Sequence, residues 1–519
     1  MGSSIVNITV IVIYFLSLLL IGYAASKKIK STSDFIVGGR ELNFWVFVLL
    51  IISSCASGMS LLGSAGLGFK TGWPTIWEQM LVPLACALSI FLFGTKIYRV
   101  SQKKNFVTIQ DYLSLRYNST KSIRTLSSII VIIVSTIYLS GQYMAISITM
   151  GWLFKMPHEY ALLLGAVIVM LYVILGGLYA VAWTALFQGI IIIVGVLVVA
   201  PFIIANAGGL THINENLAKI DPNMLALAYP QAHPPVAPYA FATPLYLVSF
   251  ALLLGFGLAS APHIVSNSLS AKRYKYFKWA PLAAFGIYVV VFYLIKISGY
   301  AARSMVYDKT LVLPNVANAA DYSFIAAIQA AMPQFIWPIF AIIVLSAVLT
   351  TTDSLMLRIG SSFSWDIYKK FLKPDATDKQ INNVNRIVIV VAALGTMLAA
   401  IKPPELLAWL IWTGIGIMLS TFVAPILFGL YWRRTTKEGA FWGMLSGLIS
   451  ALVFGYFAKF VTKFPVDFSL LSFTVSVLVL IVVSLCTKPV ADSILDETET
   501  GFFINKKSLI DKSQVLKRK

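Results

Sequence analysis

FWVFVLLIISSCASGMSLLGSAGLGF, residues 44–69, is the most informative stretch of the sequence. It is apolar and long enough to cross a membrane as one helix. Its middle, however, is a run of small and polar residues from Ala56 to Ser60, followed by glycines at 63, 66 and 68. Glycine loosens a helix and frees backbone N–H and C=O groups, which a membrane tolerates only where the backbone lines a cavity. We therefore expect a broken membrane helix beside a cavity.

A second apolar stretch, residues 241–266, is interrupted in the same way. It contains Gly255-Phe256-Gly257 and then Ala261-Pro262-His263. This stretch is the fifth after the first broken one, and an odd offset reverses the direction in which a helix crosses the membrane. Paired interruptions at such an offset are typical of two inverted five-helix repeats with a binding site near the membrane midplane.

The composition of the chain indicates an all-α polytopic membrane protein. Of its 519 residues 58% are hydrophobic and only 12% are charged, with a mean hydropathy of +0.83, whereas about a quarter of a soluble domain is charged. A soluble enzyme, a disordered chain and a nucleic-acid binder are therefore excluded. The apolar runs are too long for barrel strands. We expect about 13 transmembrane helices, within 5–23, 44–69, 75–98, 123–153, 159–175, 183–205, 241–266, 279–302, 335–363, 384–401, 404–430, 439–458 and 466–487.

These stretches predict a single transmembrane domain followed by a polar tail. The domain covers residues 1–487, with a first span at 5–23, repeat one at about 44–205, repeat two at about 241–430 and extra spans within 439–487; the basic tail is 488–519. Two predicted outer connections are long, 206–240 and 303–334, and the second contains a helix-like run from Asp321 to Met332. They are interpreted either as caps or gates of the cavity or as plain solvated loops.

The basic residues predict the orientation of the helices. If the N-terminus is outside and the spans alternate, 28 Lys and Arg residues lie on the inner side and 8 on the outer side. Loops on the cytoplasmic side carry the excess of Lys and Arg, so we expect the N-terminus outside and the C-terminus in the cytoplasm. The net charge of +19 then lies mostly on the cytoplasmic face, where it suits anionic lipid.

One acidic residue, Asp353, falls deep within a predicted span. It belongs to the run SAVLTTTDS, residues 346–354, which is rich in hydroxyl groups. Charges inside a membrane helix are costly and mark functional sites, and hydroxyl and carboxylate oxygens suit a small hard cation. The run predicts a cation site, and the alternative is a polar patch satisfied by neighbouring helices.

Two basic residues also lie within predicted spans. Lys296 either holds an anionic group of a solute, pairs with Asp353 or snorkels outward. Arg358 lies seven residues after Thr351, about 10 Å along a helix, and is expected either in the cytoplasmic vestibule or at a lipid headgroup or loop.

Several local motifs together resemble the sodium/solute symporter family. These are Gly176 to Thr184 with Gln188, Gly429 to Arg434 with Gly439-Ala440, and Ser361-Ser362 with Asp366 to Lys369. Pro262-His263-Ile264 is similar to the sodium/proline and sodium/pantothenate permeases, and the runs 63–72 and 402–405 are most similar to the pantothenate branch. The resemblance implies a LeuT-type five-plus-five inverted repeat.

The resemblance also implies site residues. A main sodium site would use the carbonyl groups of Ala56, Met59 and Ala347 and the hydroxyl groups of Thr350 and Thr351. A solute cavity would involve Gly63, Glu78, Tyr138, Ala261, His263, Lys296 and Trp412.

The sequence departs from the family pattern at three positions. Ala185 stands where many members carry an Asp that helps bind a second sodium, and Asp353 with Ser354 is a candidate replacement. Gly58 and Asn267 stand where the proline permeases carry an Asp and an Arg, which argues against proline as the solute.

The function expected from these features is sodium-coupled symport of a small organic solute across the plasma membrane. We expect a carboxylate-bearing solute, pantothenate or another monocarboxylate, because a half-helix N-terminus and Lys296 both favour one. The alternatives are a proton-coupled transporter with Asp353 as proton carrier and, from another class, a solute sensor. An enzyme is not expected, since the motifs of common catalytic sites are missing. The expected partners are the solute, Na⁺ and the lipid bilayer, with no cofactor, nucleic acid or obligatory protein partner.

Overall fold

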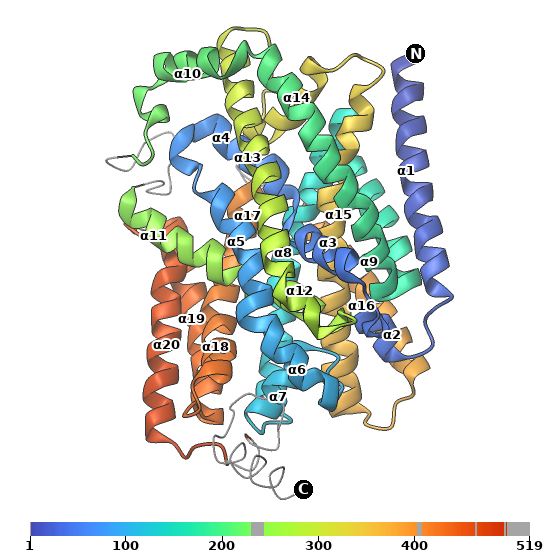
Figure 1. Ribbon diagram of the computed structural model, residues 1–519, viewed down its shortest axis with the longest axis vertical. Helices are drawn as coiled ribbons and strands as arrows, with labels where there is room; N and C mark the ends of the chain where they lie inside the picture. The colour runs from blue at the N-terminus through green and yellow to red at the C-terminus, as the bar shows by residue number, and fades with distance from the viewer. Residues whose placement is uncertain (1, 230–242, 402–406, 462–463, 492–494, 496–519) are drawn as a thin grey trace, which may run out of the picture.

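The computed structural model describes the chain except for residues 1, 230–242, 402–406, 462–463, 492–494 and 496–519. The described part is a bundle of helices (Figure 1). Their bounds are α1 Gly2–Ser26, α2 Thr32–Val37, α3 Phe44–Cys55, α4 Ser64–Thr71, α5 Glu78–Leu88, α6 Thr95–Lys104, α7 Ile109–Arg116, α8 Ser122–Phe154, α9 His158–Asn206, α10 Gly209–Ile220, α11 Pro244–Leu252, α12 Pro262–Val265, α13 Ala280–Tyr307, α14 Ser323–Ala331, α15 Trp337–Ser361, α16 Asp378–Ala399, α17 Leu407–Met418, α18 Ala424–Tyr431, α19 Lys437–Phe460 and α20 Phe468–Cys486.

The number of membrane-spanning helices differs from the expected thirteen. In the described residues eleven helices are long and apolar enough to cross a membrane, and α3 with residues Met59–Thr71 forms a bent pair that makes a twelfth. The stretch expected at 159–175 forms only a shorter apolar helix, His158–Leu171, the first part of α9. The rest of α9 follows a kink at Gly177, whose φ is +49°. A side chain there would come closer than 3.0 Å to the backbone of Phe35, so the kink requires glycine.

Both predicted helix interruptions are present. α3 ends at Cys55, and the chain resumes as a helix at Met59 with a bend of 62°. The second broken helix begins as α11 and continues through a π-helical segment, Leu253–Gly257. It restarts as α12 at Pro262, where proline is tolerated because the first turn of a helix needs no N–H donor.

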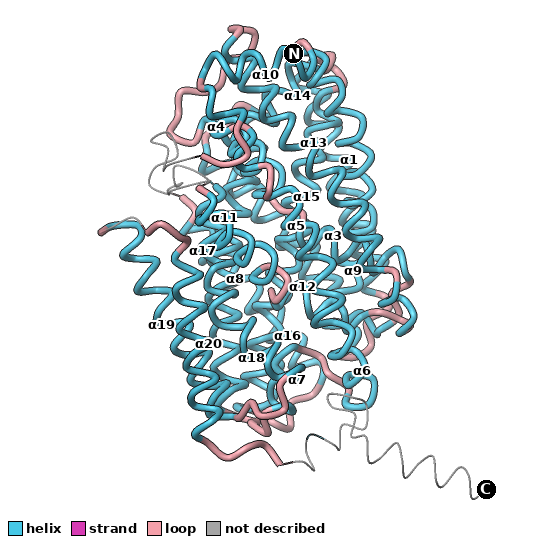
Figure 2. Tube along the Cα trace, turned by 60° about the vertical axis from the view of Figure 1, so that its left-hand side comes forward, coloured by secondary structure: helices cyan, strands magenta, loops and turns pink. Residues whose placement is uncertain are grey.

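The helix α15 is the centre of the bundle. In its most apolar window 83% of the residues are buried, against 33% for α1 and α20. α8 and α9 pack directly against α15. In Figure 1 α1 lies at one edge and the α19–α20 pair at the other, and Figure 2 shows α18, α19 and α20 together on one side. The hydroxyl-rich run of α15 is therefore placed in the middle of the protein.

The two ends of the bundle carry different connections. α10 and α14 cover the end at which α1 starts, whereas α6, α7 and the end of α20 lie at the opposite end (Figure 1). The helix expected between Asp321 and Met332 is confirmed as a short 3₁₀ turn, Ala319–Tyr322, followed by α14. At the opposite end Arg40 donates hydrogen bonds to the carbonyl oxygens of Ser101 and Phe106. Two basic connections that are expected on the same face therefore meet at this end of the bundle. The orientation of the bundle across the membrane stays a prediction from charge.

Candidate ion and solute sites

The first candidate site connects the break after α3 to the middle of α15. The Thr350 hydroxyl lies 2.9 Å from the carbonyl oxygen of Ser53 and 3.0 Å from that of Ala347. The Thr351 hydroxyl lies 2.9 Å from the carbonyl oxygen of Ala56 and 3.3 Å from that of Ser53. All five residues are buried. Two helices far apart in the sequence thus share one group of oxygen atoms.

These oxygens exceed what the two hydroxyl groups can satisfy. Four carbonyl oxygens lie within 3.4 Å of the threonine hydroxyls, and each hydroxyl has only one hydrogen to donate. Neutral carbonyl and hydroxyl oxygens are the ligands that hard cations take. The group is therefore suited to one small cation such as Na⁺. We call it the oxygen cluster: Ser53, Ser54, Ala56, Ala347, Thr350 and Thr351.

The oxygen cluster contains four of the five residues predicted as sodium ligands. The fifth, Met59, starts the next helical segment, and its carbonyl oxygen accepts a hydrogen bond from the N–H of Ser64. The sequence analysis did not find Ser53 and Ser54. Their carbonyl groups are available because α3 ends at Cys55, and the last four carbonyls of a helix lack partners within it. This end rule is the signal that could have identified them.

The residues predicted to form a second cation site contact different neighbours. Ser354 Oγ lies 3.2 Å from Ser54 Oγ, beside the oxygen cluster. Asp353 lies close enough to Tyr14 on α1 and Tyr143 on α8 to act on them electrostatically. The second site stays a prediction. The alanine side chain of Ala185 supplies no oxygen ligand, and its backbone carbonyl oxygen accepts a hydrogen bond from Ser53 Oγ at 3.1 Å.

Predicted solute-cavity residues meet between the two broken helices. The ring of Tyr138 on α8 faces that of His263 on α12 edge-on, with 5.5 Å between their centres. Ser57, in the first break, lies within hydrogen-bonding reach of Tyr138. Ala261 immediately precedes α12, in the second break. The structure thus brings together residues more than 200 positions apart, as the paired interruptions predict.

Gly58 holds the first break close to α8. Its N–H donates a hydrogen bond to Gln142 Oε1 at 2.9 Å. A Cβ at this position would lie closer than 3.0 Å to Cβ of Ala145. The acid that the proline permeases carry here therefore does not fit unless α8 moves.

Gly63 and Trp412 show how α17 contacts both broken helices. A Cβ on Gly63 would lie 3.6 Å from Cβ of Ala408 on α17. Trp412, also on α17, packs edge-on against Phe250 of α11, with 4.9 Å between ring centres. α17 therefore contacts the segment Met59–Gly63 of the first broken helix and α11 of the second.

Glu78 and Lys296 form a buried ion pair. Lys296 Nζ lies 2.7 Å from Glu78 Oε2, and both side chains are 0% exposed. The Ser64 hydroxyl donates to the same oxygen at 3.1 Å, and Thr75 Oγ1 lies 3.4 Å from Lys296 Nζ. Lys296 therefore pairs with Glu78 and not with Asp353. Since its charge is compensated within the protein, it does not need the carboxylate of a solute.

Two glycines allow α4 to pack closely against α13 beside this ion pair. A Cβ on Gly299 would lie closer than 3.0 Å to the carbonyl oxygen of Ala65. A Cβ on Gly68 would lie 2.8 Å from Cδ of Lys296. Small residues at such contacts allow membrane helices to approach closely.

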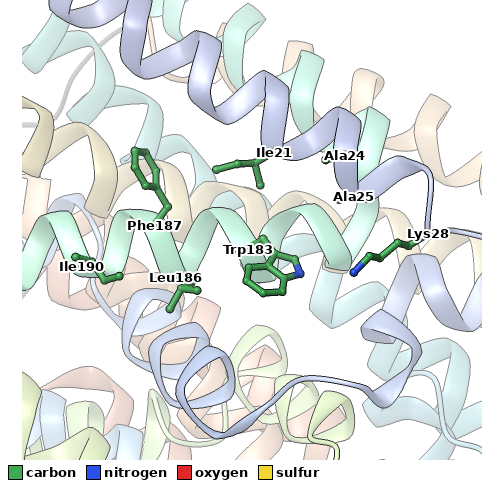
Figure 3. Close-up of a pocket in the computed structure, with 8 residues that line it drawn as sticks. All are labelled: Ile21, Ala24, Ala25, Lys28, Trp183, Leu186, Phe187 and Ile190. Carbon is green, nitrogen blue, oxygen red and sulfur yellow. The ribbon is translucent and has the colours of Figure 1, made fainter.

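A separate groove lies between α1 and α9 (Figure 3). Its volume is about 420 Å³, and apolar side chains such as Phe187 and Ile190 line it. In Figure 3 Lys28 lies at one end of it, and Trp183 lies between Lys28 and Leu186. The groove shares no residue with the oxygen cluster or the predicted solute cavity. Trp183, which belongs to the family-like motif from Gly176 to Thr184, therefore lies apart from both.

Known proteins share both the sequence pattern and the fold. The model of the sodium:solute symporter family matches residues 35–447. The sodium/pantothenate symporter of Escherichia coli is 24% identical over 427 residues, 82% of this chain and 85% of that protein. The sodium/proline symporter of the same organism is 25% identical over 440 residues, 83% of this chain and 84% of that protein.

One solved structure has closely similar architecture. A Na⁺-coupled sialic acid symporter, in a substrate-bound outward-open state, superposes with a TM-score of 0.76 at 18% identity and covers 93% of this chain and 98% of its own. At this identity the likeness establishes the fold alone, and it supports the expected LeuT-type arrangement. The relatives are transporters and not enzymes. The chain belongs to the sodium:solute symporter family, integral transporters of the plasma membrane whose coupling ion is Na⁺.

Proposed function

We propose that this transporter imports a small carboxylate-bearing solute, pantothenate or another monocarboxylate, together with Na⁺. The observation that carries the sodium part is the oxygen cluster. It contains more oxygen acceptors than its two hydroxyl groups can satisfy, all of them buried and uncharged. A bound Na⁺ would accept the oxygen lone pairs that the two hydroxyl hydrogens cannot satisfy.

The position of the oxygen cluster suggests how Na⁺ and solute binding are coupled. Na⁺ would join the end of α3 to α15 and thereby hold the first break in one geometry. Tyr138, Ser57 and His263 lie around the same break and its counterpart, where a solute would bind. Ordering the break for one ligand lowers the cost of binding the other, so each should raise the affinity for the other by the same factor. Movement of the broken helices against α8 and α15 would then expose the site to the other side.

Lys296 does not support a carboxylate-bearing solute, because Glu78 already compensates the charge of this lysine. Support comes from the similarity to the sodium/pantothenate symporter over 82% of the chain and from the departures at Gly58 and Asn267 from the proline permeases.

Sodium titration of the purified protein tests the first part of the proposal. A ligand that binds only the folded state raises the melting temperature by mass action. We expect a rise with Na⁺, beyond that with K⁺ or Li⁺, that is lost in Thr351→Ala. Thr352→Ala is the matched control, since the neighbouring Thr352 is buried as deeply but its hydroxyl bonds to the carbonyl oxygen of Val348 in its own helix. Equal shifts for Na⁺ and K⁺, or a Na⁺ shift kept in Thr351→Ala, would refute the assigned site.

Uptake into vesicles tests the second part. Radiolabelled pantothenate and other monocarboxylates should accumulate only with an inward Na⁺ gradient, and Thr351→Ala should abolish accumulation. A proton-coupled mechanism is the second candidate, because Asp353 is a fully buried acid in the centre of α15. That mechanism predicts uptake driven by an inward proton gradient without Na⁺, which Asp353→Asn would abolish.

A further inference from the structure

Arg358 carries a buried charge that the protein leaves uncompensated. Its side chain belongs to α15 and the residue is only 3% exposed. Within the described part of the chain Nε and Nη1 have no hydrogen-bond partner, and Nη2 makes one bond of 3.3 Å to Asn267 Oδ1. Among the described residues no acidic side chain lies within 4.0 Å of the guanidinium group, so the nearest polar partner is an uncharged amide.

Arg116 shows how the same fold treats another buried arginine. Arg116 is 1% exposed, and its guanidinium group donates to the carbonyl oxygens of Gly429, Trp432 and Thr435. A guanidinium group has five N–H donors, and burying them without acceptors is costly. The contrast indicates that the missing acceptors at Arg358 come from a ligand.

The polar groups around Arg358 suit a small anion. Asn267 Nδ2 donates to Ser54 Oγ at 2.9 Å, which connects this region to the edge of the oxygen cluster. His263 is fully buried, Arg358 acts on it electrostatically, and neither of its ring nitrogens has a hydrogen-bond partner by geometry, although the backbone of Ser54 lies near the ring. The imidazole and the guanidinium group can therefore offer N–H donors to the same ligand.

The location of Arg358 affects how Na⁺ would leave the oxygen cluster. Arg358 lies two helical turns, about 10 Å, beyond Thr351 toward the end of α15 that is predicted to be cytoplasmic. A fixed positive charge there repels Na⁺ leaving the oxygen cluster, and an anion bound to Arg358 would remove this repulsion. Anion and Na⁺ should therefore bind more tightly together than alone.

We infer that Arg358 and Asn267, with His263 beside them, form a binding site for a monovalent anion on the cytoplasmic side of the oxygen cluster. Two sources supply this chemistry, the carboxylate of the solute on its way to release and chloride. The inference rests on the proposed function, because it assumes Na⁺ in the oxygen cluster and a solute that bears a carboxylate.

The test measures the melting temperature of the purified full chain at a constant, saturating Na⁺ concentration while sodium sulfate is replaced by sodium acetate or sodium chloride. We expect a saturable rise with at least one of the two monovalent anions. The rise should disappear in Arg358→Gln. A rise with acetate that exceeds the rise with chloride assigns the site to the solute carboxylate, and the reverse assigns it to chloride.

Asn267→Asp keeps the proposal testable if Arg358→Gln does not fold. The new carboxylate would lie at hydrogen-bonding distance from Arg358 and replace the ligand. We expect a higher melting temperature without added anion and no further rise with acetate or chloride. Asn216→Asp, at a buried asparagine on α10 at the opposite end of the molecule, should keep the anion-dependent rise.

Absence of a saturable rise with either anion, or a rise that both Arg358→Gln and Asn267→Asp retain, overturns the site. The sodium titration of Thr351→Ala is independent of this result, since it varies Na⁺ and leaves the anion unchanged. A normal Na⁺ shift without an anion shift therefore rejects the anion site alone, and the loss of the Na⁺ shift rejects the proposed function.

Discussion

Lys296 Nζ and Glu78 Oε2 lie 2.7 Å apart between α13 and α5, and neither side chain is exposed. The pair joins the helix that follows the second break to the region just after the first break. In the membrane interior such a pair is stable only if both charges remain and their other polar contacts are satisfied.

Removing one member of the pair should destabilise the protein more than removing both. Lys296→Met leaves Glu78 buried without its cation, and we expect a loss of about 3–5 kcal/mol in the free energy of unfolding. The double variant Lys296→Met/Glu78→Gln should recover part of this loss, because no buried charge is left. Thermal unfolding of the wild type, the two single variants and the double variant measures the coupling. Simple additivity would contradict a direct ion pair.

The contact between α4 and α13 should depend on one glycine of α13 and not on another. Gly299→Ala places a methyl group closer than 3.0 Å to the carbonyl oxygen of Ala65 and should cost about 1–3 kcal/mol. Gly286→Ala is the matched control on the same helix, since nothing lies within 4 Å of its Cβ position; it should be neutral or gain up to about 1 kcal/mol. Equal melting temperatures of the two variants would show that the helices do not pack this way.

The stability of the region before α14 should depend on pH through Asp321. This residue lies before α14, outside the membrane spans, and its Oδ2 accepts a hydrogen bond from the N–H of Leu407 at 3.0 Å. Burial raises the pKa of Asp321 from 3.8 to about 7, although the N–H of Leu407 and the charge of Lys70 act in the opposite direction. Between about pH 4 and 7, Asp321 therefore keeps its proton in the folded state, whereas it has lost that proton in the unfolded chain.

This difference in proton binding makes the folded protein less stable as the pH rises. The contribution of Asp321 to stability is fully present below about pH 4 and is lost as the pH rises through about 7. Asp321→Asn should remove this part of the pH dependence, so that the variant gains stability relative to wild type as the pH increases over this interval. Melting temperatures of both proteins across the interval measure it, and parallel curves would contradict the raised pKa.

The contact between Tyr138 and His263 should matter for the solute and not for sodium. If the solute binds between the broken helices, Tyr138→Leu should weaken the solute-dependent rise in melting temperature at saturating Na⁺ and leave the Na⁺-dependent rise unchanged. Loss of both responses would mean that Tyr138 contributes to the ion site or to the stability of the fold as a whole. Thr351→Ala, which is expected to lose the Na⁺ response first, is the reference.

The helical class and the two interrupted helices could be predicted from the sequence alone. Composition excludes a soluble chain, and glycine, serine and proline inside apolar stretches mark the interruptions because they weaken helical hydrogen bonding locally. The resemblance to the symporter family named Ala56, Ala347, Thr350 and Thr351, whereas the residues alone predicted only a cation site in the hydroxyl-rich run of α15. The expected thirteen helices were less secure, since a kink at a single glycine, Gly177, determines how the long apolar run of α9 divides.

Which charges meet depends on the packing of the helices and could not be predicted from the sequence. In the sequence, Lys296 is compatible with a solute contact, with a pair to Asp353, with a structural counter-charge and with a snorkelling side chain, because the relative rotation of the helices is not a local property. The packing of α13 against α5 places Lys296 beside Glu78, whereas Asp353 lies near Tyr14 and Tyr143. The packing of the helices also leaves Arg358 beside Asn267 without an acid, because burial and long-range pairing depend on how the helices are assembled.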